Sequence, residues 1–194
     1  MNFQQMKLLV SAPNKASWPD LDMPEIVLAG RSNVGKSSLI NTLCNQKQMA
    51  YVGNTPGKTR LLNFFDVGNE MVLVDVPGYG YANASQKMLI QFGQMMEEYF
   101  SLRTQLKGVV VLLDVRHKPT EDDLSMIEFA RWRHLPILIV ITKVDKCGHH
   151  ELQKNLVRIA EAISIPIQDL ILFSSKTRKG RDILISKIED LIKN

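Results

Sequence analysis

The sequence predicts an α/β fold built on a six-stranded, mostly parallel sheet with one antiparallel strand and with helices on both faces. Short runs rich in Val, Ile and Leu alternate with longer stretches of helical period, which is typical of strand–helix units around a parallel sheet. One pair of apolar stretches is joined only by Gly68-Asn69, whose turn chemistry favours a tight antiparallel hairpin. The length of 194 residues suits a single domain.

The expected elements follow from these patterns in chain order. Four runs are apolar throughout and read as strands buried on both faces: 25–29, 109–113, 137–141 and 170–173. The hairpin strands are expected at 60–67 and 71–76. Helices are expected at about 37–46, 85–103, 121–133, 150–163 and 180–193. Residues 1–24 are expected to form an N-terminal edge segment of one domain spanning 1–194, because no linker or repeat divides the chain.

Composition excludes several classes of protein. Hydrophobic residues make up 45% of the chain, which argues against disorder, and the two cysteines are too far apart for a Cys-x-x-Cys motif. No apolar run approaches the roughly 20 residues that span a bilayer. We therefore expect a cytoplasmic protein without a membrane partner, and a monomer is the default state. The net charge of +4 is compatible with RNA but does not require it.

A phosphate-binding motif follows the first buried strand directly. The segment Gly30-Arg31-Ser32-Asn33-Val34-Gly35-Lys36-Ser37 matches G-x-x-x-x-G-K-[ST], with a strand before it and a helix after it. Its backbone amides and the helix N-terminus would hold the phosphates, and Ser38 extends this set by one residue. Lys36 would bridge the β- and γ-phosphates as a catalytic group, and the Ser37 hydroxyl would bind Mg²⁺.

Three further segments stand at strand ends in the order that a GTPase requires. In Asp75-Val76-Pro77-Gly78, Asp75 would hold Mg²⁺ through a water and the catalytic Gly78 amide would sense the γ-phosphate. In Thr142-Lys143-Val144-Asp145, the Asp145 carboxylate can accept two hydrogen bonds from guanine, and the Lys143 stem can lie along the base. Ser174-Ser175-Lys176 would close over the base from the other side.

A long segment without clear period precedes the hairpin. In Gly57-Lys58-Thr59-Arg60-Leu61, the Thr59 hydroxyl is the candidate for a second Mg²⁺ ligand made only with GTP, and we include the whole segment among the nucleotide-binding residues. Thr55 is the rival ligand. The alternative interpretation is a Pro-Gly turn with a solvent-facing Thr.

These residues together resemble the EngB family of bacterial GTPases, also called YihA or YsxC, within the group that includes Era and MnmE. The resemblance spans roughly residues 7 to 190 and is carried by the motifs above, with Asp75-Val76-Pro77-Gly78-Tyr79-Gly80-Tyr81 as the most specific, and by Thr55-Pro56-Gly57-Lys58-Thr59 and Asp114-Val115-Arg116-His117. It implies a Ras-like P-loop GTPase domain that binds GTP, GDP and Mg²⁺. It further implies a role in assembling the large ribosomal subunit, from rRNA and ribosomal proteins, and a link to cell division and septation.

Two residues bear on the rate of hydrolysis. Tyr79 stands where many GTPases have the Gln that orients the attacking water, so we expect a low intrinsic rate that a partner or a cation raises. Related GTPases with Asn at the place of Asn33 use it to hold K⁺, so K⁺ stimulation is expected by resemblance. A local backbone hydrogen bond from Asn33 is an equally weighted alternative.

A basic run follows the last strand and leaves two interpretations open. Lys176, Arg178, Lys179 and Arg181 could contact RNA or could form a solvated face, and the resemblance favours RNA. For the whole chain, a GTP-driven switch explains all the motifs. A P-loop phosphotransferase would leave Thr142-Lys143-Val144-Asp145 unexplained, and a non-hydrolysing interaction module would differ from the switch only in rate and partner.

Overall fold

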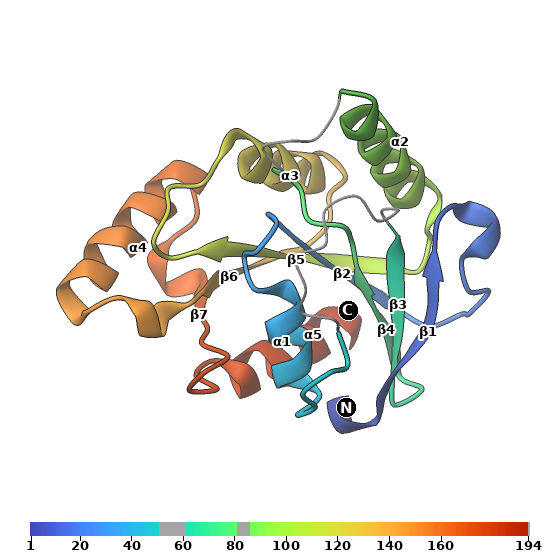
Figure 1. Ribbon diagram of the computed structural model, residues 1–194, viewed down its shortest axis with the longest axis horizontal. Helices are drawn as coiled ribbons and strands as arrows, with labels where there is room; N and C mark the ends of the chain where they lie inside the picture. Colours follow the sequence, from blue (N-terminus) through green and yellow to red (C-terminus); the bar gives the residue numbers. More distant parts are fainter. Residues whose placement is uncertain (51–60, 81–85, 194) are drawn as a thin grey trace.

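A computed structural model describes residues 1–50, 61–80 and 86–193 (Figure 1). The strands are β1 (Met6–Ala12), β2 (Glu25–Gly30), β3 (Leu62–Val67), β4 (Met71–Asp75), β5 (Leu106–Asp114), β6 (Ile137–Thr142) and β7 (Leu170–Leu172). The helices are α1 (Lys36–Leu43), α2 (Gln86–Leu102), α3 (Glu121–Trp132), α4 (His149–Ile163) and α5 (Arg181–Lys193). Single 3-10 turns are η1 (Phe3–Gln5), η2 (Lys15–Ser17), η3 (Val144–Lys146) and η4 (Ile167–Asp169).

The described strands form one sheet in the order β1-β3-β4-β2-β5-β6-β7. β3 runs antiparallel to both of its neighbours, β1 and β4, and the remaining pairs are parallel, so the prediction of one antiparallel strand is confirmed. The turn between β3 and β4 places Gly68 and Asn69 at φ 62° and 57°, as the hairpin prediction requires.

The predicted count of six strands is wrong by one, because the N-terminal edge segment contributes β1. This strand pairs with β3 across a bulge between Leu8 and Val10. Only its end residues, Met6 and Ala12, are buried, and Leu8 and Leu9 are exposed. A strand whose apolar side chains face solvent has no alternating pattern, so its sequence does not reveal its partner.

The core lies on both faces of the sheet, as predicted. Alternate residues of β5 point to opposite sides: Val109, Val111 and Leu113 pack with α2, α3 and α4, whereas Val110 and Leu112 pack with α1 and α5. Figure 1 shows α2 and α3 on one side of the sheet and α1 and α5 on the other. This arrangement leaves the ends of the strands free to carry polar groups.

Helix ends show local chemistry. α3 begins with the expected cap, in which the Thr120 hydroxyl accepts from the Asp123 N–H at 3.4 Å and the Asp123 carboxylate accepts from the Thr120 N–H at 2.9 Å. α1 ends at Leu43 rather than at residue 46, because Asn45 adopts a left-handed φ of 56°. Among the described residues, none of the helices combines the length and the apolar character needed to cross a bilayer.

Candidate functional site

The predicted motif segments meet at the carboxyl edge of the parallel strands. The P-loop connects β2 to α1, Asp75 is the last residue of β4, and Lys143 and Asp145 follow β6. Phe173 follows β7 and is tied to β6 because its N–H donates to Ile141 O at 2.8 Å. Ligands of such sheets bind at the carboxyl ends of the strands. The strand order therefore brings the candidate residues together at one edge of the sheet.

The P-loop is fixed from the side of β6. The Thr142 hydroxyl lies 2.7 Å from Val34 O and 3.2 Å from Leu113 O, and Thr142 is buried. Gly35 has a φ of 113°, a conformation that side chains rarely adopt, and it directs the chain into α1. The loop therefore presents its amides beside the N-terminus of α1 in a fixed shape.

Lys36 and Asp75 face each other across the floor of the site. Lys36 Nζ lies 3.8 Å from Asp75 Oδ1, and both side chains are largely buried. Within the described part of the chain, Asp75 Oδ1 is buried without a hydrogen-bond partner. Burial raises the pKa of Asp75, and Lys36 opposes this shift. A carboxylate oxygen that has no hydrogen-bond partner among the described residues is a type of ligand that suits Mg²⁺.

The Asp75–Gly78 segment lies directly on the P-loop. A Cβ on Gly78 would stand 2.9 Å from both Cα and N of Ser32, so only glycine permits this approach. The Ser32 N–H donates to Tyr79 O at 2.8 Å, and Arg31 and Tyr79 form a parallel bridge. The two segments that would sense the phosphates are therefore joined through their backbones.

The Tyr79 side chain points into the core. Its exposed fraction is 5%, and it packs with the apolar cluster between the sheet and α2, α3 and α4. Burial, and then the nearby Asp123 carboxylate, raise the pKa of Tyr79 far above its usual range. The phenol is thus held neutral and buried in the core.

Lys143 lies over the outer surface of the P-loop. Its backbone is left-handed at φ 60°, and its Nζ donates to Asn33 O at 2.7 Å and lies 2.9 Å from Asp114 Oδ2. Burial would raise the pKa of Asp114, but hydrogen bonds from Arg116 and Lys143 outweigh it and hold the pKa well below its usual range. These groups line part of a cavity of about 200 Å³.

Asp114 is not among the binding residues that the sequence predicts, although it belongs to the motif that carries the resemblance and contacts Lys143. Its contact with Lys143 depends on the sheet register, which pairs Asp114 at the end of β5 with Thr142 at the end of β6. The signal in the sequence was a lone carboxylate at a buried strand's end, which is the same signal that marked Asp75.

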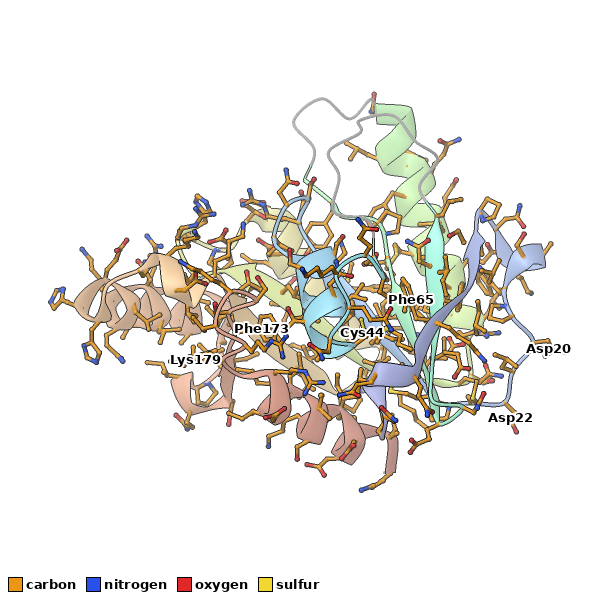
Figure 2. All side chains as sticks on the ribbon, turned by 60° about the horizontal axis from the view of Figure 1, so that its bottom comes forward. Asp20, Asp22, Cys44, Phe65, Phe173 and Lys179 are labelled. Atoms are coloured by element: carbon orange, nitrogen blue, oxygen red, sulfur yellow. The ribbon has the colours of Figure 1, made fainter. Side chains whose placement is uncertain are left out.

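The carboxylate predicted to read guanine is oriented by a buried hydroxyl. Ser174 is fully buried, and its Oγ donates to Asp145 Oδ1 at 2.6 Å. This hydrogen bond lowers the pKa of Asp145. Ser175 and Lys176 are exposed in the loop that follows, and Figure 2 shows Phe173 and Lys179 at its two ends, where Ser174 N donates to Lys179 O at 3.1 Å.

Two of the four residues in the basic run after β7 donate hydrogen bonds to other parts of the protein. Arg181 donates from Nε to Thr42 O at 3.0 Å and from Nη2 to Leu43 O at 2.7 Å, and Arg178 donates to Asn45 Oδ1 at 2.6 Å. These two arginines cap the carboxyl end of α1. Lys176, Arg178 and Lys179 are exposed, so the choice between RNA contact and a solvated face concerns these three residues.

Several predicted residues lie outside the described ranges. They are Gly57, Lys58, Thr59 and Arg60, together with the rival ligand Thr55. Leu61 is described and stands half-buried before β3. The other predicted residues lie in the segments above: Gly30 to Ser38, Asp75 to Gly78, Thr142 to Asp145 and Ser174 to Lys176.

The model of a family described as 50S ribosome-binding GTPase matches residues 25–143. Curated relatives named "Probable GTP-binding protein EngB" include one from Streptococcus pneumoniae strain Hungary19A-6, 46% identical over 183 residues and 94% of each chain. One from Mesoplasma florum is 48% identical over 178 residues, covering 91% of this chain and 90% of the relative.

Solved structures agree on the fold. A crystal structure of a probable GTP-binding protein engB superimposes with a TM-score of 0.71 at 24% identity, over 87% of this chain and 98% of the other. Era in complex with MgGDPNP and a segment of 16S ribosomal RNA gives a TM-score of 0.65 at 21% identity, over 88% of this chain and 57% of Era.

Proposed function

Because the chain belongs to the EngB family of P-loop GTPases, we propose that it is a GTP-driven switch in the assembly of the large ribosomal subunit, with a link to cell division and septation. The enzyme hydrolyses GTP, as its family does. The proposed partners are GTP, GDP and the large subunit or its precursors, and the protein would act as a cytoplasmic monomer without a membrane partner.

One observation carries the proposal: the segments for phosphate, metal and base converge on a single sheet edge, with Asp145 oriented by Ser174 at 2.6 Å. A carboxylate fixed in this way accepts the N1–H and N2–H donors of guanine, which adenine does not offer as a pair. The arrangement supports guanine nucleotides over the nucleoside-kinase alternative.

The proposed nucleotide contacts follow the order of the chain. Gly30 to Ser38 would surround the phosphates with main-chain amides, and Lys36 would leave Asp75 to bridge the β- and γ-phosphates. Gly78, already against Ser32, would offer its amide to the γ-phosphate. The remaining proposed contacts are Gly57, Lys58, Thr59, Arg60, Leu61, Val76, Pro77, Thr142, Lys143, Val144, Asp145, Ser174, Ser175 and Lys176.

Mg²⁺ is the proposed metal, with Ser37 and Thr59 as direct ligands and Asp75 acting through a water. The buried, unpartnered Asp75 Oδ1 supports this assignment. When bound, Mg²⁺ neutralises charge that develops on the phosphate oxygens. The protein's own part is to hold Asp75 at the end of β4, within 3.8 Å of Lys36 Nζ, and to position the Ser37 hydroxyl at the start of α1.

We further propose a low intrinsic rate that K⁺ raises. The buried Tyr79 leaves the attacking water without a side-chain amide. Asn33 is exposed, and its side chain makes no hydrogen bond to the described residues, which favours the K⁺ role over the local backbone bond. Rates in KCl and NaCl at equal ionic strength test this idea, and equal rates would remove it.

Co-sedimentation with large ribosomal subunits in GTP, GDP or a non-hydrolysable GTP analogue tests the switch itself. We expect the protein to sediment with the subunit in GTP and the analogue but not in GDP. Lys36→Ala, which removes the bridge to the phosphates, is the matched control and should sediment in none of them. Equal sedimentation of the wild type in all three states would contradict a switch.

A further inference from the structure

Trp132, the last residue of α3, is the one aromatic side chain among the described residues that is exposed to solvent. Its exposed fraction is 70%, the highest among the exposed large hydrophobic side chains of the described residues. It lies at the opposite end of α3 from Asp123, which is close to Tyr79, so the nucleotide site does not use it. An exposed indole forgoes a large gain from burial, which indicates an interaction site.

The indole ring is held in place before any partner arrives. It stacks on Phe129, with centroids 6.0 Å apart and planes inclined by 30°, and Phe129 meets Phe100 edge-on at 5.2 Å. Arg131 donates to Ile163 O at the end of α4 at 2.7 Å, and Arg133 donates to Phe100 O near the end of α2 at 2.8 Å. The backbone on both sides of Trp132 is thereby anchored, so a partner would pay little conformational entropy to use the ring.

The residues that flank Trp132 in the sequence are cationic. The Arg133 guanidinium carbon lies 5.9 Å from the Trp132 ring centroid, and Arg131 and His134 are exposed beside it. Each arginine commits Nη2 to a carbonyl and has further N–H donors for a partner. From Glu128 to His134 the only acidic residue is Glu128.

This chemistry distinguishes two kinds of partner. A protein partner gains most where an aromatic anchor is surrounded by a ring of contacts that exclude water. An unpaired nucleobase needs only one open aromatic face and cations for the adjacent phosphates. The indole is 70% exposed and is flanked in the sequence by two arginines, on a chain with net charge +4, so it fits the second requirement.

We propose that Trp132 is a stacking platform for an unpaired base of RNA, with Arg131 and Arg133 facing the flanking phosphates. The RNA would belong to the ribosomal particle, and in this respect the inference rests on the proposed function. The platform adds a second contact surface, apart from the nucleotide site.

The first test uses fluorescence. The chain has two tryptophans, so Trp18→Phe leaves Trp132 as the only reporter. Trp18 packs edge-on against Tyr99 at 5.4 Å, and its buried indole N–H has no partner among the described residues, so phenylalanine loses no hydrogen bond there. A single-stranded oligoadenylate of about a dozen nucleotides should quench Trp132, and an RNA duplex of equal charge should not, because its bases are paired and cannot turn out to meet the ring. No quenching, or equal quenching by both, would overturn the platform.

The second test measures affinity for large subunits in GTP. Trp132→Ala should weaken association about tenfold, as expected for the loss of one stacked base, and Trp132→Phe should retain most of it. Ile183→Ala, which removes another exposed apolar side chain, is the control and should have no effect. GTP affinity without subunits should be unchanged in all variants.

The outcomes separate this inference from the proposed function. If the wild type binds no subunit in GTP, the switch proposal fails while the oligoadenylate result still decides the platform. If Trp132→Ala binds subunits as the wild type does, the platform fails and the switch proposal stands. If Trp132→Ala weakens association but RNA does not quench the reporter, the surface contacts protein and the RNA proposal is overturned.

Discussion

The orientation of the Asp145 side chain depends on a buried neighbour, Ser174. Its carboxylate is exposed, whereas the Ser174 hydroxyl that holds it is fully buried and also accepts from the Thr177 N–H at 3.2 Å. An exposed carboxylate normally samples several rotamers, and ordering it costs free energy on binding. The buried hydroxyl fixes the Asp145 rotamer before the base binds, so less free energy is lost when the carboxylate contacts guanine.

Exchanging one carboxylate oxygen of Asp145 for an amide nitrogen tests whether this residue selects guanine. Asp145→Asn keeps the acceptor for Ser174 but replaces one oxygen with an amide donor, so GTP affinity should fall by about a hundredfold while xanthosine triphosphate, which offers a carbonyl there, should gain affinity. Titration with fluorescent nucleotides in Mg²⁺ measures both. Asp169→Asn, in η4, is the neutral control. Unchanged GTP affinity would show that another residue reads the base.

Ser174→Ala should change the response to pH. The Ser174 hydrogen bond lowers the pKa of Asp145, so in the wild type the carboxylate stays ionised, and GDP stays bound, until the pH falls below the ordinary range of an aspartate. Without that bond the pKa rises, and GDP affinity should decline from a higher pH as acid is added. Binding measured from about pH 8 to about pH 4 gives the two midpoints. Coincident midpoints would mean that Ser174 does not stabilise the ionised form.

At the scale of elements, the sequence predicts the ends of the strands but not the contacts between elements that are distant along the chain. Periodicity located β2, β4, β6 and β7, and their ends carry the motifs, so Gly30 to Ser37, Asp75 and Asp145 could be named from the sequence. The capping of α1 by Arg181 joins positions 138 and 139 residues apart, and no local pattern encodes it. For Arg181 the sequence leaves RNA contact and a solvated face open, and the structure shows that this arginine caps a helix instead.

Gly180 links these elements and should not tolerate a side chain. It has a φ of 78°, and a Cβ there would lie 2.0 Å from Leu172 O, so Gly180→Ala must displace the chain between β7 and α5. We expect a destabilisation of about 2–3 kcal/mol together with weaker binding of both GTP and GDP. Thermal unfolding and nucleotide titration measure the two effects.

Gly93 is the matched control for that substitution. It lies within α2, where an added Cβ meets nothing within 4 Å. Gly93→Ala should stabilise the protein by up to about 1 kcal/mol through helix propensity alone and should leave nucleotide affinity unchanged. A Gly180→Ala protein that melted like Gly93→Ala would refute the steric argument.

Across the whole molecule, the polar groups are divided between the two ends of the sheet. The carboxyl edge carries the candidate site, and the amino end of β2 carries a buried cluster of Glu25, Tyr99 and Arg103. Arg103 also donates to Pro19 O at 2.7 Å, so the cluster joins β2, α2 and the N-terminal segment. From the sequence, Glu25 reads only as the first residue of an apolar strand, because its partners lie 74 and 78 positions away.

Glu25 should therefore govern stability without governing nucleotide binding. Its carboxylate is fully buried, accepts from Tyr99 Oη at 2.5 Å and pairs with Arg103 Nη2 at 2.6 Å, so Glu25→Ala leaves a buried guanidinium uncompensated, at a cost of about 3–5 kcal/mol. For a chain of this size the melting temperature should drop by about 10 °C. GTP affinity measured well below that temperature should stay within about twofold of the wild type, because changes at distant sites are independent.

Asp182→Ala is the control. It breaks an ion pair whose carboxylate is 91% exposed, so it should shift the melting temperature by no more than about 1–2 °C. Equal melting of the two variants would mean that the cluster does not hold the amino end of the sheet together, and a parallel loss of GTP affinity would mean that the two ends are coupled.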